Sequence, residues 1–251
     1  MGRITINLAT FPPRKTGLAA RLLELSPQCD LMRVYLNGYK HWPKDIFRPN
    51  NVEYICGDGR QAPDLGSQGK LFWIDPAVDE HYLTCDDDIR YSTIYAAHMV
   101  TGCMRYDNQA VVSLHGGSFR MPKGNLPDDV DPRSIRKLLS YTAHIPRDTA
   151  VMLAGNGIMC CHPMTLGLHK DDLIRGPLHS GDDEDMAIWC QRRKKSVIVL
   201  AHNGGLACAD FENCNVQAQF ANPECVAKQN TKLRSWRRWQ VTPRPTQKGR
   251  V

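Results

Sequence analysis

The chain has 251 residues, 42% of them hydrophobic, and a formal net charge of +6. A chain of this size and composition can bury one well-packed core, and because no run of about 18 apolar residues occurs, we expect no membrane-spanning helix. Eight Lys or Arg residues and no acidic residue lie between 226 and 251, so residues 1–225 carry 6 − 8 = −2 and the basic character belongs to the C-terminal segment.

The N-terminal half alternates between strand-like and helix-like segments. RITINLAT (3–10) is rich in β-branched residues and ends at the turn-forming FPPR, and KTGLAARLLEL (15–25) then repeats leucine at helical spacing. Further strands are predicted at LMRVYLNG (31–38), NVEYICG (51–57) and HYLTCDDDI (81–89), and a helix is predicted at STIYAAHMVTGCM (92–104).

The second half begins with a strand, QAVVSLHGG (109–117). Residues 118–148 are rich in Pro, Asp, Gly and Lys, which predicts a long mobile excursion with one short helix, RSIRKLLSYT (133–142). Strand character returns at 149–163, a helix is predicted at DDEDMAIWCQRRKK (182–195) with acids first and bases last, and SVIVLAHN (196–203) is the last clear strand.

Alternating strands and helices predict an α/β fold with a mostly parallel sheet covered by helices on both faces. We expect one domain over residues 1–205 and a basic extension over 206–251. In such sheets ligands bind beyond the carboxyl ends of the strands. The loops expected to matter are therefore TFPPR, CGDGR, DDDIR, HGG and HNGG.

Three consecutive aspartates, Asp86, Asp87 and Asp88, follow the apolar run of the 81–89 strand. A solvated turn is the simplest explanation. The alternation of a strand, however, places Asp86 and Asp88 on one side and Asp87 on the other. Two carboxylates facing the same crevice suit Mg²⁺ or Mn²⁺, often completed by phosphate oxygens. We therefore expect a metal site held by Asp86 and Asp88.

Four segments together resemble a glycosyltransferase of the GT-A fold, similar to the large family-2-like group. They are NLATFPPR, DLGSQGKLFWI (64–74), TCDDDI, and the helix and strand DDEDMAIWCQRRKKSVIVLAHN (182–203). Each motif is common by chance, but the ordered set covers residues 3–205. The resemblance implies a GT-A, Rossmann-like domain that transfers a sugar from a nucleotide-sugar donor, expected to be a UDP-sugar.

The resemblance also implies residue roles around the donor. The metal would be held chiefly by Asp88, with Asp86 reaching the ribose or a metal-bound water, and His202 is placed where the family often supplies a further metal ligand. A loop-capping role explains His202 equally well. The other residues expected to contact the nucleotide or its diphosphate are Thr10, Pro13, Arg14, Asp58, Lys70 and Asp87.

An inverting transfer needs a base for the acceptor hydroxyl, and the family places it second in a Glu-Asp pair at the start of a helix. Alignment puts Asp182 and Asp183 on that pair, which makes Asp183 the expected base. Asp182 replaces the usual glutamate, and Asp185 is an alternative base. Neighbouring acids would raise the pKa of such a carboxyl towards neutrality. Stabilisation of the helix dipole is the competing explanation for these acids.

The C-terminal segment bears on the acceptor. Its basic and aromatic side chains suit phosphate contact and base stacking, and they are Arg234, Trp236, Arg237, Arg238 and Trp239. We favour a hydroxymethylated pyrimidine in viral DNA, which would have to be flipped out of a duplex. A surface polysaccharide or lipid-linked glycan is the first alternative. A non-catalytic nucleic-acid-binding module is the second.

A metal-dependent nucleotidyltransferase is a further alternative function. Such an enzyme would bring a glycine-rich phosphate loop near the N-terminus, and TFPPR is a poor match for that loop.

The remaining expectations concern cellular location and a zinc site. The opening residues lack a secretory signal, so we expect a cytoplasmic protein, in the host cytoplasm if viral, with reduced cysteines. A zinc site is conceivable from residues whose spacing matches no tight knuckle, namely His202, Cys208, Cys214 and Cys225.

Overall fold

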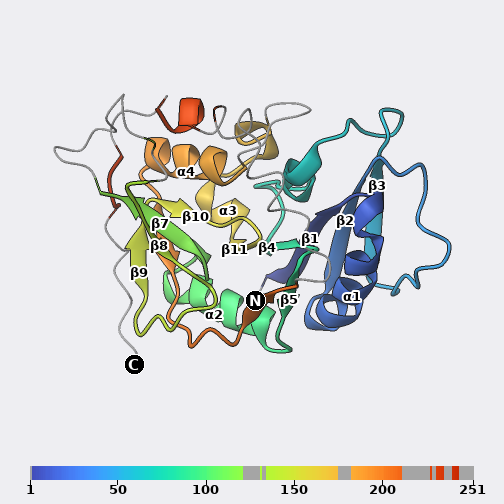
Figure 1. Ribbon diagram of the computed structural model, residues 1–251, viewed down its shortest axis with the longest axis horizontal. Coiled ribbons are helices and arrows are strands. Elements are labelled where there is room, and N and C mark those ends of the chain that lie inside the picture. The colour runs from blue at the N-terminus through green and yellow to red at the C-terminus, as the bar shows by residue number, and fades with distance from the viewer. Residues whose placement is uncertain are drawn as a thin grey trace.

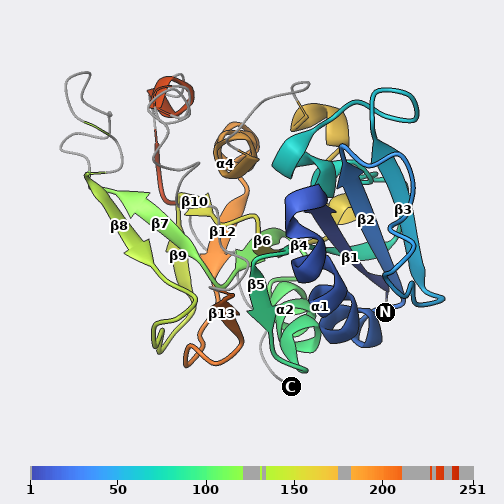
Figure 2. The same cartoon turned by 45° about the vertical axis from the view of Figure 1, so that its right-hand side comes forward.

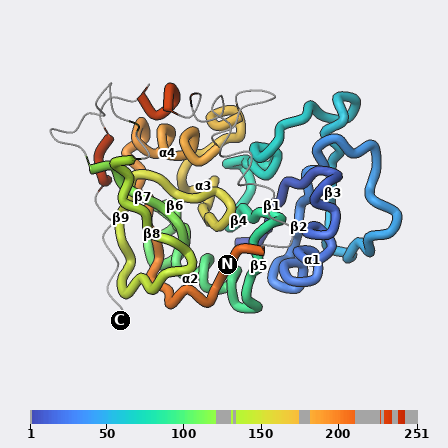
Figure 3. Tube along the Cα trace, in the orientation of Figure 1, coloured from blue at the N-terminus to red at the C-terminus, as the bar shows by residue number. Residues whose placement is uncertain are grey.

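The computed structural model describes residues 2–120, 131, 134–174, 182–210, 227, 230–234 and 239–242. Its centre is an eight-stranded sheet with the order β3-β2-β1-β4-β11-β6-β12-β9. Figures 1 and 3 show the N-terminal strands at one end of this sheet and the later strands at the other.

The N-terminal half of the sheet is parallel. Strand β1 (Arg3–Thr10) lies between β2 (Leu31–Asn37) and β4 (Glu80–Asp86), and β3 (Val52–Gly57) forms the edge. Strands β1, β2 and β3 and helix α1 (Lys15–Leu25) match the predicted segments within one residue, whereas β4 ends three residues before the predicted end at 89. The chain alternates in this half because each parallel connection must cross a face of the sheet.

The second half of the sheet is mixed. Strand β6 (Ala110–Ser113) is parallel to β12 (Ser196–Val199), but β11 (Ile158–Cys161) runs antiparallel to β4 and β6, and β9 (Thr149–Val151) runs antiparallel to β12. The expected α/β architecture is confirmed, whereas the expectation of a mostly parallel sheet is too simple. The sheet is mixed because β9 and β11 both run opposite to β4, β6 and β12.

Helices cover both faces of the sheet, as Figure 1 shows. Helices α1 and α2 (Tyr95–Arg105) pack on one face, and α3 (Pro163–Leu166) and α4 (Asp182–Arg193) pack on the other. The strands serve both cores because successive side chains point to opposite faces. In β12, for example, Ile198 joins the α1–α2 core, whereas Val197 and Val199 join the α4 core.

The predicted helix over 133–142 is wrong. Residues Arg136–Leu139 form strand β8, which pairs with β7 (Gly116–Phe119), and β7 pairs in turn with β10 (Leu153–Ala154). Figure 2 shows this small sheet beside the main one. The segment has helix-like apolar spacing, but the tertiary pairing with β7 satisfies its backbone and overrides local propensity. Residues 121–130, 132 and 133 of the predicted excursion lie outside the described residues.

The segment beyond residue 205 returns to the domain. Strand β13 (Ala207–Ala209) pairs antiparallel with β5 (Ile89–Tyr91) directly after the aspartates. Farther along, Gln240 and Gln191 of α4 exchange two hydrogen bonds of 2.8 and 3.0 Å. Strand β13 and the backbone of Gln240 are therefore hydrogen-bonded to the rest of the domain.

Candidate functional site

The carboxyl ends of β1 and β4 lie side by side, with Ala9 opposite Asp86. This register brings the TFPPR loop to the aspartates. The hydroxyl of Thr10 donates to one oxygen of Asp87 at 2.7 Å, and the guanidinium of Arg14 donates to the other at 2.6 Å. Asp87 is thus a buried anchor between the two segments. Burial raises the pKa of Asp87, although the positive charge of Arg14 opposes this.

Asp88 lies beside the same guanidinium. One of its oxygens is 3.2 Å from Arg14, and the side chain is buried. Burial and the negative charge of Asp86 raise the pKa of Asp88 to about 6. The negative charges of Asp86 and Asp88 therefore repel each other.

Lys70 links Asp86 to helix α4. Its ammonium group lies 2.5 Å from an oxygen of Asp86 and 3.1 Å from an oxygen of Asp182, the first residue of α4. The lysine side chain is only 3% exposed. Burial alone would lower the pKa of Lys70, but the charges of Asp182 and Asp86 raise it overall, so the lysine is charged. Its short helix, η3 (Gly66–Leu71), packs against the β1 side of the sheet.

The 155–157 turn completes the site. A Cβ atom on Gly157 would lie 2.0 Å from an oxygen of Asp86, so only glycine allows this approach. The backbone N–H of Asn156 donates to Asp183 at 2.7 Å, and the Thr84 hydroxyl donates to the carbonyl of Asn156. The amide side chain of Asn156 is 1% exposed, and neither of its polar atoms has a hydrogen-bond partner in the structure.

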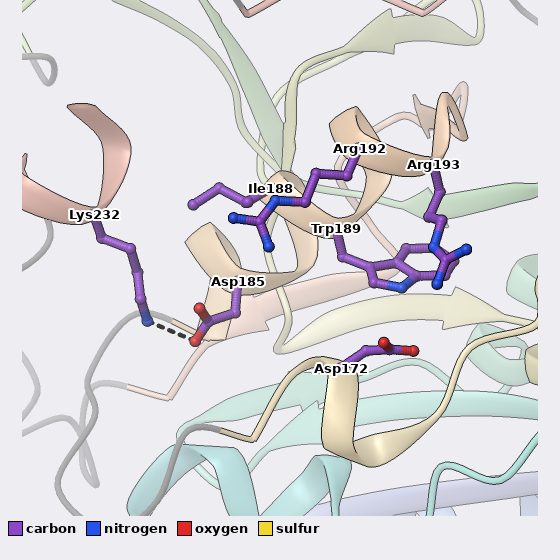
Figure 4. A pocket seen from close by; sticks show the side chains of 7 residues that line it. All are labelled: Asp172, Asp185, Ile188, Trp189, Arg192, Arg193 and Lys232. Carbon is purple, nitrogen blue, oxygen red and sulfur yellow. Dashed lines mark hydrogen bonds and ion pairs between the residues drawn. The ribbon is translucent and has the colours of Figure 1, made fainter. Parts of the chain in front are cut away.

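The two candidate bases have different surroundings. Asp183 is partly buried and bonded to the 155–157 turn, and burial together with the charges of Asp182 and Glu184 raises its pKa well above the usual value. Asp185 points to other partners. It accepts from Gln68 at 3.0 Å and pairs with Lys232 at 2.6 Å, as Figure 4 shows for the lysine. The geometry therefore connects Asp183, rather than Asp185, to the 155–157 turn that lies against Asp86.

Seven of the predicted residues come together, whereas four have other surroundings, namely Pro13, Asp58, Asp185 and His202. The residues that come together are Thr10, Arg14, Lys70, Asp86, Asp87, Asp88 and Asp183. Pro13 is exposed on η1 (Pro12–Arg14). Asp58 caps a turn, because it accepts from the backbone N–H groups of Arg60 at 2.9 Å and Gln61 at 3.2 Å. These bonds lower the pKa of Asp58.

His202 occupies a backbone-bonded position. Its Nε2 is 3.0 Å from the carbonyl oxygen of Leu114, and its Nδ1 accepts from the N–H of Gly204 at 3.2 Å. Both ring nitrogens are thus engaged with the main chain, which is the loop-capping arrangement. Metal ligation by His202 stays a prediction and would require one of these bonds to break.

The basic tail is less available than expected. Trp239 is 1% exposed, packs against Phe119 at 5.2 Å between ring centroids and donates to the carbonyl of Leu233 at 3.0 Å. The expectation that Trp239 contacts a DNA acceptor is therefore wrong, because the ring belongs to a hydrophobic core. Arg234 is partly buried, and Trp236, Arg237 and Arg238 lie outside the described residues.

The structure adds three residues to those expected from the sequence. Asp182 contacts Lys70, Gln68 donates to Asp185, and the backbone N–H of Asn156 donates to Asp183. The four-acid run at 182–185 was the available signal for Asp182. Nothing in the sequence indicates that Gln68 meets Asp185, because that contact arises only from packing.

Three further findings concern metal ligands and membrane spans among the described residues. Among the described residues, no three His, Cys, Asp or Glu side chains are arranged to hold a metal ion by themselves. Cys214 and Cys225 of the conceivable zinc set lie outside those residues, and Cys208 is free and exposed. No helix in the described parts of the chain is both long and apolar enough to cross a bilayer.

Comparison with known proteins adds no identification. The chain matches no protein-family model, and a search of curated proteins finds no match. The site must therefore be interpreted from its own chemistry.

Proposed function

We propose that the chain is a GT-A-type glycosyltransferase that moves a sugar from a nucleotide-sugar donor, a UDP-sugar, to a hydroxyl acceptor. One observation carries the proposal. The segments that resemble the family lie far apart in the sequence, yet Arg14, Lys70, Asp86, Asp88 and Asp182 meet at the carboxyl ends of β1 and β4. This is where an α/β sheet binds its ligands.

A divalent cation fits the charge of the site. Five carboxylates, at Asp86, Asp87, Asp88, Asp182 and Asp183, face two cations, Arg14 and Lys70. Burial and, after it, the negative charge of Asp86 raise the pKa of Asp88. Magnesium is commonly bound by one or two carboxylates together with substrate phosphates, so Asp86 and Asp88 would suffice as protein ligands for Mg²⁺ or Mn²⁺. When bound, the ion would offset charge on the leaving diphosphate.

Residues of the protein would bind the diphosphate and accept the proton of the acceptor hydroxyl. Arg14 and Lys70 lie beside the carboxylates and supply positive charge where the diphosphate would bind. Thr10 and Asp87 fix the loop that carries Arg14. Asp183 accepts the proton of the acceptor hydroxyl, and the N–H of Asn156 holds its carboxylate in place.

Donor binding tests the proposal directly. Calorimetry with UDP-, GDP- and TDP-sugars in the presence of Mn²⁺ should reveal binding of one donor, and a chelator should abolish it. Asp88→Asn should weaken that binding at least tenfold, because it removes a metal ligand. The matched control is Asp45→Asn, an exposed aspartate paired with Lys15, which should bind normally.

Two results would reject the proposal. One is the absence of binding by every donor tested, with and without metal. The other is metal-independent binding that Asp88→Asn leaves unchanged. Acceptor assays with hydroxymethylated DNA and with glycan acceptors follow only after a donor is found.

A further inference from the structure

A pocket lies along helix α4. Its volume is about 460 Å³, and Figure 4 shows the side chains that line it. Three are basic, Arg192, Arg193 and Lys232, and two are acidic, Asp172 and Asp185. Trp189 and Ile188 supply the apolar wall. The pocket has no part in the proposed donor site, although Asp185 is only two residues from Asp183.

The two carboxylates are already engaged. Asp185 pairs with Lys232 at 2.6 Å and accepts from Gln68 at 3.0 Å. Asp172 accepts from the backbone N–H of His169 at 3.1 Å in a capping arrangement. The lining as a whole has one more basic than acidic side chain. An anion is therefore the favoured occupant.

Two hydrogen-bond donors in the pocket have no partner among the described residues. The indole N–H of Trp189 is buried and unbonded, although the side chain is only 5% exposed, and Figure 4 shows the nitrogen facing the space towards Asp172. The guanidinium of Arg193 is exposed and forms no hydrogen bond or ion pair with any described residue. A buried N–H without an acceptor is unfavourable, so a ligand oxygen would satisfy it.

The surroundings indicate a polyanion rather than a single small anion. Arg192, Arg193 and Lys194 are consecutive exposed cations at the end of α4, and they extend beyond the pocket. Helix-dipole stabilisation explains cations at this end, but it does not explain the unbonded indole N–H. Ten residues of helix separate Arg193 from Asp183, about 15 Å at 1.5 Å per residue. That is about four nucleotides along one strand of a duplex.

We infer that this pocket binds a backbone phosphate of a DNA strand, with the Trp189 N–H and the Arg193 guanidinium as its donors. The inference that this strand is the acceptor rests on the proposed function, whereas the inference that the pocket binds phosphate is independent of the proposed function. The same helix would then present the base Asp183 at one end and hold the acceptor backbone at the other.

The test uses the full chain and a short fluorescein-labelled single-stranded DNA, with binding followed by anisotropy over a salt series. Arg193→Gln should weaken binding about tenfold and reduce the slope of log K against log salt by about 0.7, the value for one phosphate contact on a single strand. Trp189→Phe should weaken binding about threefold at an unchanged slope, because it removes a neutral donor. Lys44→Gln, an exposed lysine between β2 and β3, is the matched control.

Each outcome decides the matter. Loss of DNA affinity in both variants but not in the control supports the inference. If Arg193→Gln binds DNA as Lys44→Gln does, the inference is overturned, and so it is if the protein binds only vesicles containing phosphatidylglycerol. Thermal unfolding checks that Trp189→Phe remains folded, and the exposed Arg193 variant serves if it does not. Both variants should bind the nucleotide sugar normally. A pocket that binds DNA in a protein that binds no donor would refute only the transferase proposal.

Discussion

Lys70 and Asp182 lie 3.1 Å apart, although more than 100 residues separate them in the sequence. The lysine is buried between this aspartate and Asp86, so its charge is fully compensated inside the protein. This contact joins η3 to the start of α4. It therefore brings the 64–74 segment and the 182–203 segment, which both resemble the glycosyltransferase family, next to Asp86.

Removal of the lysine charge should therefore destabilise the protein strongly. Lys70→Met leaves two carboxylates without their buried partner, which costs about 3–5 kcal/mol of unfolding free energy. Urea unfolding at pH 7.5 measures the loss. The double variant Lys70→Met with Asp182→Asn should recover part of it, because one uncompensated charge is gone. A loss below about 1 kcal/mol would show that the contact is not a structural ion pair.

Asp183→Asn should abolish transfer and leave donor binding intact. A general base contributes about 10²–10⁴-fold, so the rate should fall by at least about a hundredfold. Because the pKa of Asp183 is raised by burial and neighbouring acids, wild-type kcat should rise with pH until the carboxyl is fully ionised. Asp185→Asn is the comparison, and it should retain transfer because Asp185 is engaged with Lys232 and Gln68. Loss of transfer in Asp185→Asn but not in Asp183→Asn would instead identify Asp185 as the base.

Glu184 should make stability depend on pH. The side chain is 6% exposed with one oxygen unbonded, and burial raises its pKa from 4.5 to about 7. A carboxyl with a raised folded pKa contributes stability that is present below the unfolded pKa. That contribution is lost as the pH rises through the folded pKa, here between about 4.5 and 7.

Glu184→Gln should accordingly be more stable than the wild type at pH 8, by about 1–3 kcal/mol, and no more stable at pH 4. Thermal and urea unfolding at both pH values provide the measurement. Glu53→Gln, on an exposed position of β3, should show no such difference. If Glu184→Gln and Glu53→Gln changed the stability equally at pH 8, burial of Glu184 would not be the cause of its raised pKa.

Gly157→Ala should displace Asp86. The added Cβ would meet the carboxylate at 2.0 Å, so the side chain must move away from Lys70 or the turn must shift. We expect metal-dependent donor affinity to fall about tenfold or more while the protein stays folded. Gly205→Ala is the control, because its nearest contact is a flexible side-chain oxygen at 3.3 Å. Unchanged donor affinity in Gly157→Ala would show that Asp86 does not contribute to donor binding.

The sequence was most informative where local pattern and tertiary structure agree. Strands β1, β2, β3 and β4 and helices α1 and α4 lie close to their predicted bounds, because their apolar periodicity matches the faces that they bury. The same reasoning failed at Arg136–Leu139, where pairing with β7 outweighs helix-like spacing. It also failed at Trp239, because a basic neighbourhood in the sequence does not show whether a ring is buried.

By itself, the sequence determined the alternating α/β pattern, the position of three aspartates at a strand end, and the basic character of the C-terminal segment. These properties follow from local composition and periodicity. Only the tertiary structure decided that Lys70 lies between Asp86 and Asp182, that Asp183 rather than Asp185 faces the 155–157 turn, and that His202 bonds to the main chain. Such contacts join segments far apart in the chain, and their partners are chosen by packing and strand order rather than by neighbouring residues.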